Sequence, residues 1–239
     1  MNFHEQTFHS PAESLACDEA LLDAAEEQGG SPVLLFWEAP RHFVVLGYAN
    51  RAAEEANLEA CRVAGVPVLR RCSGGGTVLQ GPGCLNYSVI LRTDSAPALG
   101  SITGTNRFVM ERNAAAIGGL LGQPVTIEGH TDLAVGPRKF SGNAQRRKRD
   151  WLLFHGTVLI DFDLALLGRF LRHPTREPDY RGRRGHEEFV TNIPVERDAL
   201  KAALRTAWGA HKSQAEIPKA RMGALVTERY SRDEWNLSR

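Results

Sequence analysis

The sequence has little cysteine and no long hydrophobic run, and each shortage excludes a class of protein. The four cysteines (Cys17, Cys61, Cys72 and Cys84) form no CxxC pair and have no metal-ligand spacing, which argues against a zinc site or a disulfide framework. No apolar stretch approaches the roughly 20 residues that span a bilayer. The N-terminus lacks a secretory hydrophobic segment, so we expect a cytoplasmic protein with reduced thiols and no membrane partner.

An excess of charge of either sign is also lacking. The chain has 29 lysines and arginines against 28 acidic residues, a net charge of +1, which gives no general reason to expect a nucleic acid as partner. Two local stretches are basic, residues 138–149 and residues 172–186. Most of the second lies in a polar, Arg- and Gly-rich region over 174–188, which we predict to be a long loop of the kind that is often functional.

Hydrophobic periodicity and capping residues predict alternating helices and strands. Ser10-Pro11-Ala12-Glu13 supplies an N-cap, a proline at the first helical position and a capping-box glutamate, and Gly29-Gly30 ends that helix. Further helices are expected over 53–64 and 106–121, and the section after residue 163 should be mainly helical. Strands are expected over 33–37, 43–46, 67–71, 86–91, 125–127, 133–135, 138–140 and 152–161.

These elements favour an α+β fold in which a mixed, largely antiparallel sheet is packed with helices. At 239 residues the chain has the length of a single catalytic domain with a hydrophobic core of its own. We expect the core of this domain over about 10–212 and a C-terminal extension over 213–239, anchored by Leu225, Tyr230 and Trp235. No separate C-terminal accessory domain is expected.

The segment Arg70-Arg71-Cys72-Ser73-Gly74-Gly75-Gly76-Thr77-Val78 has the composition of an anion site. Backbone without side chains can approach a ligand closely and turn its amides inward, beside two guanidinium groups. No Gly-Lys-Ser/Thr follows, so the segment is not a P-loop. Successive side chains on a strand point to opposite faces, so we expect only one of the two arginines to enter the site.

A second segment, Arg138-Lys139-Phe140-Ser141-Gly142-Asn143-Ala144, presents one lysine in what we predict to be a short Ser/Gly-rich turn. His155-Gly156-Thr157 then lies on the next predicted strand. Activating an acid with ATP requires a site for a carboxylate beside a site for a phosphate, and the two segments together suggest such a pair. Lys139 is the candidate catalytic residue, because an ammonium group stabilises the negative charge that gathers when a carboxylate attacks the α-phosphate.

The sequences RRCSGGGTV, RKFSGNAQ and LLFHGTVLI, in this order and at this spacing, resemble the motifs of the lipoate-protein ligase family, which is related to biotin ligases and octanoyltransferases. The resemblance runs from about Leu35 to Leu171. It implies a biotin/lipoate ligase-like catalytic domain with the class II synthetase-like fold. It also implies an acid–amide ligase that converts lipoate and ATP into lipoyl-AMP and pyrophosphate, and passes the lipoyl group to a lysine of a carrier domain.

The resemblance assigns roles to individual residues. Lys139 matches the lysine that contacts the acyl carbonyl and the phosphate, and Asp132 matches an acidic residue that could hold Mg²⁺ or the adenylate. It makes Arg70 the likelier of the two arginines to reach the phosphate or the acyl pocket, and it places His155 in the wall of the acyl or nucleotide pocket. The residues expected to bind substrate or nucleotide are Arg70, Arg71, Ser73, Gly74, Gly75, Gly76, Thr77, Gly83, Ser141, Gly142, Asn143, Ala144, His155 and Gly156.

The chain departs from the family pattern at two places. Family ligases often read His-Asp-x-Gly-Asn after the glycine run, whereas this chain has Gln80-Gly81-Pro82-Gly83-Cys84, so that only the glycine is kept. Thr131 stands before Asp132, where family members often have asparagine. These departures suggest altered metal handling or nucleotide affinity, and they could put a thiol near the acyl pocket.

Alternative functions follow from the same resemblance. An octanoyltransferase or amidotransferase would take an acyl group from a carrier thioester without ATP, through a cysteine nucleophile. The cysteine-dependent relatives place that cysteine elsewhere and often replace the third glycine with arginine, whereas Gly76 is intact. A third possibility is a lipoate-binding relative without turnover, or a chain that is active only with a separate accessory polypeptide.

The resemblance also implies ligands and partners. ATP and lipoate are the expected substrates, with Mg²⁺ as the metal. The expected protein partner is a lipoyl carrier domain, of the 2-oxoacid dehydrogenase E2 kind or a glycine cleavage H-like protein. Such domains are typically acidic, so the basic stretches over 138–149 and 172–186 are candidate docking surfaces.

Overall fold

The computed structural model describes residues 1–213 and 216–239, and its largest element is an eight-stranded sheet. In spatial order the strands are β11 (Lys212–Ser213), β1 (Asn2–Thr7), β2 (Val33–Glu38), β6 (Cys84–Arg92), β10 (Trp151–Leu159), β9 (Arg138–Arg147), β8 (Asp132–Val135) and β7 (Thr126–Glu128). From β2 to β7 every neighbouring pair is antiparallel, whereas β1 runs parallel to β2 and β11. The predicted mixed, largely antiparallel sheet is therefore confirmed.

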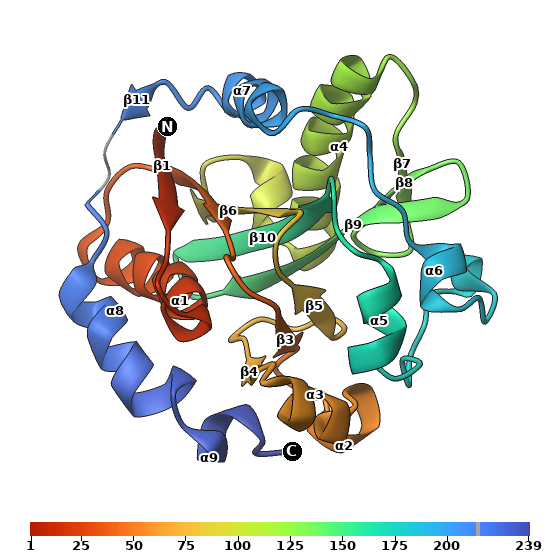
Figure 1. The fold of residues 1–239 in the computed structure, drawn as a ribbon. Coiled ribbons are helices and arrows are strands. Elements are labelled where there is room, and N and C mark those ends of the chain that lie inside the picture. Colours follow the sequence, from red (N-terminus) through yellow and green to blue (C-terminus); the bar gives the residue numbers. More distant parts are fainter. Residues whose placement is uncertain (214–215) are drawn as a thin grey trace.

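A smaller sheet and helices cover one face of this sheet. The three-stranded sheet has the order β4 (Val68–Arg70), β3 (Phe43–Leu46), β5 (Val78–Gln80). Beside it lie α1 (Pro11–Gln28), α2 (Ala52–Glu55) and α3 (Leu58–Ala64) (Figure 1). Leu35 and Trp37 of β2 pack against α1 and β3 in one buried cluster. The candidate site lies between these two layers, because side chains at alternate positions of β6 and β10 point into this interface.

The opposite face of the sheet is covered by α4 (Ile102–Leu121) and α7 (Arg197–Ala207), which stand together above it in Figure 1. Leu85, Tyr87 and Val89 of β6 contribute to the core on this side, together with Val109 and Ile117 of α4. This face carries the largest apolar cluster. It supports the strands that carry the candidate site.

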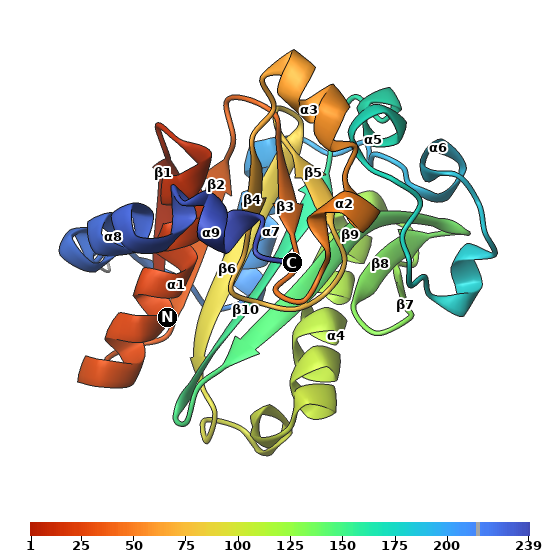
Figure 2. The same cartoon turned by 90° about the horizontal axis from the view of Figure 1, so that it is seen from below.

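The remaining elements lie at the two ends of the molecule. The helices α5 (Ala165–Phe170) and α6 (His186–Phe189) lie near β9, with a 3-10 turn at Asp179–Arg181 between them. The chain ends in α8 (Lys219–Leu225), a π turn (Val226–Tyr230) and α9 (Asp233–Asn236), which run along α1 and bring the C-terminus to α2 (Figure 2). Another 3-10 turn spans Pro97–Gly100. No helix in the described part of the chain combines the length and apolar character needed to cross a membrane.

The predicted helix boundaries are correct at α1 and need correction elsewhere. Ser10 caps α1 and Glu13 completes the capping box, as predicted. The helix predicted over 53–64 is two helices, because Asn57 leaves the helical conformation and caps a second start through the amide of Ala60. The helix predicted from residue 106 begins at Ile102, where Ser101 provides the N-cap. The sequence did not predict β1 and β5.

The C-terminal tail packs against the body of the protein, as predicted. Leu225 and Tyr230 are buried, and Trp235 packs against the same cluster. The Trp235 indole donates a hydrogen bond to the carbonyl of Arg70, and the amide of Ala52 donates to the carbonyl of Arg239. The expected extension over 213–239 includes residues 214 and 215, which lie outside the described residues.

Candidate functional site

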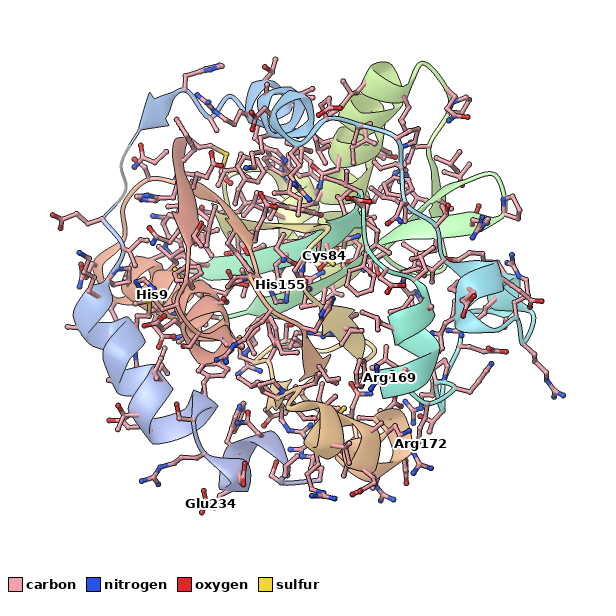
Figure 3. The ribbon with its side chains drawn as sticks, viewed as in Figure 1. His9, Cys84, His155, Arg169, Arg172 and Glu234 are labelled. Carbon is pink, nitrogen blue, oxygen red and sulfur yellow. The ribbon has the colours of Figure 1, made fainter. Side chains whose placement is uncertain are left out.

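Two cavities meet beneath the small sheet. A narrow one of about 80 Å³ lies between α1 and β10, and a wide one of about 910 Å³ extends toward α5 and α6. His155 lines the narrow cavity and Arg172 lines the wide one. In Figure 3, His155 lies near the centre of the molecule and Arg172 lies closer to its edge. Five residues line both cavities and mark the junction: Val78, Asp132, Lys139, Gly142 and Thr157.

Lys139 stands at this junction with a defined set of neighbours. Its Nζ lies 2.7 Å from Oδ1 of Asp132, and a quarter of its side chain is exposed. The hydroxyl of Tyr180 donates to the other oxygen of Asp132 at 2.8 Å. Asp132 therefore holds the lysine in place and links it to the loop that carries Tyr180.

The strand predicted over 138–140 is confirmed, but it continues through Ser141, Gly142 and Asn143, so the prediction of a short Ser/Gly-rich turn is wrong. β9 continues without a break from Arg138 to Arg147, because β8 pairs with it on one side and β10 on the other. Gly142 leaves room for the lysine in this position, since a Cβ there would lie 2.9 Å from the Lys139 Nζ and displace it. The lysine side chain thus folds back over Gly142 into the junction.

Asn143 and Gly156 form a fitted pair on neighbouring strands. The Asn143 amide accepts a hydrogen bond from the Tyr87 hydroxyl and donates to the Thr131 carbonyl and the Ser141 hydroxyl. A Cβ on Gly156 would lie 1.7 Å from the Asn143 Oδ1, so only glycine fits there. Asn143, Ala144 and Gly156 line the narrow cavity, and Ser141 lines the wide one.

The two adjacent arginines diverge, as predicted, but the expected assignment is reversed. The Arg70 side chain donates to the carbonyls of Gly47, Tyr48, Asn50 and Trp235 and lines neither cavity. Its partners belong to the 47–50 loop and the C-terminal tail, a contact that the sequence did not reveal. Arg71 instead lines the narrow cavity and donates to the carbonyls of Gly74 and Gly76. Burial lowers the pKa of Arg71 to about 10.

His155 belongs to a chain of hydrogen bonds that reaches the glycine run. Its Nδ1 lies 2.7 Å from Asp18 and its Nε2 lies 2.6 Å from the Ser73 hydroxyl, which also accepts from Nε of Arg71 at 3.0 Å. The other Asp18 oxygen accepts from Ser88. His155 lines the narrow cavity, as expected, whereas Ser73 is fully buried behind it. Sequence analysis missed Asp18, which sits inside α1 without a motif of its own.

The remaining residues of the glycine-run segment separate into two groups. Gly75, Gly76 and Thr77 line the wide cavity, whereas Gly74 and Gly83 line neither. Gly83 has a structural role, because its φ is +91° and a Cβ there would lie 2.2 Å from the Asp161 carbonyl. This explains why a glycine stands at that position in an otherwise altered motif.

The Arg- and Gly-rich loop borders the wide cavity. Arg172, Arg176, Tyr180 and Arg181 all line it, and Pro178 packs over Gly129. Arg181 is 5% exposed and its Nη2 donates to no atom, although Nε lies 3.4 Å from the Glu177 carboxylate. Burial lowers the pKa of Arg181. The predicted loop therefore contains a desolvated cation beside the wide cavity.

The described residues contain no group of three or more His, Cys, Asp or Glu side chains arranged to hold a metal ion. Both oxygens of Asp132 are occupied, one by Lys139 and one by Tyr180. The residues present therefore do not form a ready-made Mg²⁺ site. The expectation that Asp132 binds Mg²⁺ stays a prediction.

All four cysteines are buried as free thiols, and none lines either cavity where the structure describes the walls. Burial raises the pKa of Cys72 and of Cys84 to about 12. A thiol becomes a nucleophile only as the thiolate. The thiol that the altered Gln80–Cys84 stretch could have brought to the pocket is therefore absent from it, because Cys84 points into the cluster formed with Val44 and Phe162.

One family model and two relatives show what the sequence of this chain is similar to. The family model described as lipoyl protein ligase A/B catalytic domain matches residues 10–205. Lipoate-protein ligase A subunit 1 of Thermoplasma acidophilum is 27% identical, over 94% of this chain and 91% of the relative. Octanoyltransferase LipM of Symbiobacterium thermophilum is 30% identical, over 97% of this chain and 96% of the relative.

Solved structures match over the whole chain. A bi-partite lipoate protein ligase from T. acidophilum, studied with its E2 lipoyl domain, has a TM-score of 0.84 at 25% identity and covers 99% of this chain and 95% of its own. A putative lipoate protein ligase from the same organism with bound lipoic acid has a TM-score of 0.83 at 25% identity, with full coverage of both chains. A lipoate-protein ligase A bound with ATP also reaches 0.83 at 25% identity, over 99% of this chain and 98% of its own.

Proposed function

Because this chain belongs to the lipoyl protein ligase A/B catalytic-domain family and is thus an enzyme of the lipoate ligase/transferase group, we propose that it is an ATP-dependent lipoate-protein ligase. It activates lipoate to lipoyl-AMP and then transfers the lipoyl group to a lysine of a carrier domain. The observation that carries this proposal is the position of Lys139 where the narrow and wide cavities meet.

The two cavities differ in size, as do the two substrates of a lipoate ligase, lipoate and ATP. The narrow cavity has room for a slender acyl chain, and the wide one has the volume of a typical small-molecule site, roughly 300 to 1,000 Å³. The carboxylate of the acid then lies at the junction and the α-phosphate just beyond it. Relatives of the same fold have been solved with lipoic acid and with ATP, which supports these two molecules as the ligands.

Lys139 serves both steps from this position. In the first step a carboxylate oxygen attacks the α-phosphate, the bond to pyrophosphate breaks, and the ammonium group stabilises the charge that gathers between them. In the second step the carrier lysine attacks the acyl carbon and AMP leaves. The ion pair with Asp132 orients the ammonium group before either substrate arrives. We propose that Mg²⁺ is held chiefly by the nucleotide phosphates, as is common where one or two carboxylates are present.

The proposed protein substrate is a lipoyl carrier domain. A relative with the same fold is a bi-partite ligase studied with its E2 lipoyl domain, which supports this choice and leaves a role for an accessory subunit. Lys139 of the first basic stretch and Arg172 and Arg176 of the second line the wide cavity. An acidic carrier domain would meet complementary charge there.

The second candidate function is octanoyl transfer from a carrier thioester without ATP. The 30% identity to octanoyltransferase LipM favours it. The cysteines weigh against it, because a cysteine-dependent transferase needs a thiolate at the acyl pocket, and the described cavity walls hold none.

One transfer assay separates the two candidates. An apo lipoyl domain is incubated with the protein, either with lipoate, ATP and Mg²⁺ or with octanoyl-carrier protein and no nucleotide, and its intact mass is measured. We expect a lipoyl mass gain only in the first tube. Octanoyl transfer in the second tube alone would replace the ligase proposal with the transferase. If neither tube reacts, adding an accessory subunit and trapping lipoyl-AMP decide between a partner-dependent enzyme and a binding protein.

A further inference from the structure

The narrow cavity contains a chain of three polar side chains that ends in an unpaired donor. Nε2 of Gln80 donates to the Thr157 hydroxyl at 2.6 Å, and that hydroxyl donates to Oδ1 of Asn86 at 2.6 Å. Gln80 and Asn86 are at least 95% buried, with exposures of 5% and 3%. Nevertheless Nδ2 of Asn86 and Oε1 of Gln80 have no hydrogen-bond partner.

Leaving such groups unpaired is costly. A buried amide without a partner gives up the hydrogen bonds that water would make to it and gains none in return. Proteins therefore rarely keep one, and those that remain require an explanation such as a ligand or an ordered water. All three members of the chain line the narrow cavity, so a molecule bound in this cavity can supply the missing partner.

The sheet register places this chain beside the catalytic lysine. Gly142, Thr157 and Asn86 are consecutive partners across β9, β10 and β6. The Lys139 Nζ lies over Gly142, and strands are about 4.8 Å apart, so the Asn86 backbone stands about 10 Å from that of Gly142. The Asn86 Oδ1 accepts a hydrogen bond from Thr157, and Thr157 lines both cavities.

A carboxyl group offers one oxygen to a donor at each of these two positions. Two hydrogen bonds of about 2.9 Å, one to each carboxyl oxygen, bridge roughly 8 Å between two donors. Resting on the proposed function, we propose that Asn86 is a second catalytic residue, whose Nδ2 binds the carboxyl oxygen that does not attack the nucleotide. Lys139 faces the attacking oxygen from the other side, and Gln80 is a positioning residue that orients Asn86 through Thr157.

Asn86 then has a role in both adenylation and transfer. During adenylation one oxygen forms the bond to phosphorus as the bond to pyrophosphate breaks, and the other becomes the acyl carbonyl. During transfer the amine attacks the acyl carbon, and that carbonyl oxygen carries negative charge until the bond to AMP breaks and the amine proton passes to solvent. A fixed N–H donor stabilises this charge, as one donor of an oxyanion hole does.

The test compares two buried asparagines. Asn113 on α4 is fully buried and also has an unpaired Nδ2, but its carbonyl accepts from Trp208 and it lines neither cavity. In Asn86→Asp at pH 8 the donor becomes a carboxylate, and we expect kcat for lipoyl-AMP formation to fall about 100- to 1,000-fold. Activity should recover as the pH falls, because a protonated aspartate regains a donor. In Asn113→Asp, kcat per folded molecule should stay unchanged at every pH.

A measurement on the unaltered protein covers the case in which Asn86→Asp does not fold. With asparagine side chains labelled by ¹⁵N, lipoate should shift the Asn86 amide resonance and leave that of Asn113 in place. An unshifted Asn86 resonance with lipoate bound, or an Asn86→Asp variant with normal kcat at pH 8, overturns the inference. Failure of the ligase proposal looks different: the unaltered protein would then transfer octanoate without ATP, and Asn86→Asp would slow that reaction instead.

Discussion

The narrow and wide cavities share five residues yet have walls of opposite character. The narrow cavity is lined mainly by β-strands and α1, and its polar groups are fixed by short bonds such as those from His155 to Ser73 and Asp18. The wide cavity owes much of its wall to the loop that carries Arg172, Arg176 and Tyr180. A wall of paired strands resists change in shape, whereas a loop can rearrange around its ligand. In the proposed ligase, the strand-built wall would select the acid, and the loop would accommodate the nucleotide and the carrier domain.

The largest effect of a substitution is expected at the junction of the two cavities, where Lys139 lies. Replacing Lys139 with alanine removes an ammonium group that faces both cavities. We expect kcat for lipoyl-AMP formation and for transfer to fall by at least 1,000-fold, because the charge of both transition states loses its stabilising partner. The measurement is pyrophosphate release and carrier mass for each half-reaction.

Lys219→Ala is the matched control, because Lys219 is exposed on α8 and lines neither cavity. Its activity and melting temperature should equal those of the unaltered protein. Full activity in Lys139→Ala would contradict the central assignment. A Lys139→Ala protein that no longer folds would be recognised by its circular dichroism.

The rigidity of the narrow wall can be tested at Gly156. In Gly156→Ala the new methyl would lie 1.7 Å from Oδ1 of Asn143 and 2.9 Å from Cε1 of Tyr87. Overpacking of this kind costs about 1 to 3 kcal/mol. For a chain of this size that lowers the melting temperature by roughly 2 to 12 °C, measured by calorimetry.

Gly76→Ala is the counterpart in the wide wall. A Cβ at Gly76 meets nothing within 4 Å. Its melting temperature should stay within about 2 °C of the unaltered protein, since the substitution adds no clash. Equal losses of stability at Gly76 and Gly156 would remove the distinction between the two walls.

A substitution in the loop that borders the wide cavity is expected to weaken the binding of ATP. Burial and the neighbouring Asp132 raise the pKa of Tyr180, so its hydroxyl stays protonated and donates to that carboxylate. Tyr180→Phe removes a hydrogen bond to a charged group, worth about 1.5 to 3 kcal/mol. We expect KM for ATP to rise about 10-fold with a smaller change in kcat, and the melting temperature to fall by roughly 3 to 12 °C.

The control for Tyr180 is Tyr48→Phe, because Tyr48 is 37% exposed and lines neither cavity. Its kinetic constants should not change. An unchanged KM in Tyr180→Phe would separate the loop from the Asp132–Lys139 pair.

The sequence predicted the site residues that lie in contiguous motifs, and it missed those whose position depends on contacts between distant parts of the chain. Lys139, His155 and the glycine run lie in contiguous motifs, so their proximity could be expected from resemblance. The choice between Arg70 and Arg71 could not, because it depends on carbonyls of the 47–50 loop and of Trp235, which is 165 residues away. Asp18 was missed for a similar reason, since it reaches His155 over 137 residues.

Local patterns also misled where tertiary pairing decides the structure. Ser141, Gly142 and Asn143 have the composition of a turn. Strand pairing on both sides overrides that propensity, and Gly142 serves to make room for the lysine. Asn86 gave no signal in the sequence, because its importance lies in an unpaired nitrogen that only the packed cavity reveals.

The smallest expected effect concerns the cysteines, and it tests which reaction the narrow cavity supports. In Cys72→Ala and Cys84→Ala, ligase activity should stay within about twofold, since neither thiol lines a cavity. Burial raises the pKa of both thiols from 9.0 to about 12. The stabilisation from keeping them protonated is therefore complete below pH 9 and is lost as the pH rises toward 12, so unfolding measured over this range should be less pH-dependent in the variants. A loss of acyl transfer in either variant, with an acyl-cysteine detected by mass, would instead favour the transferase.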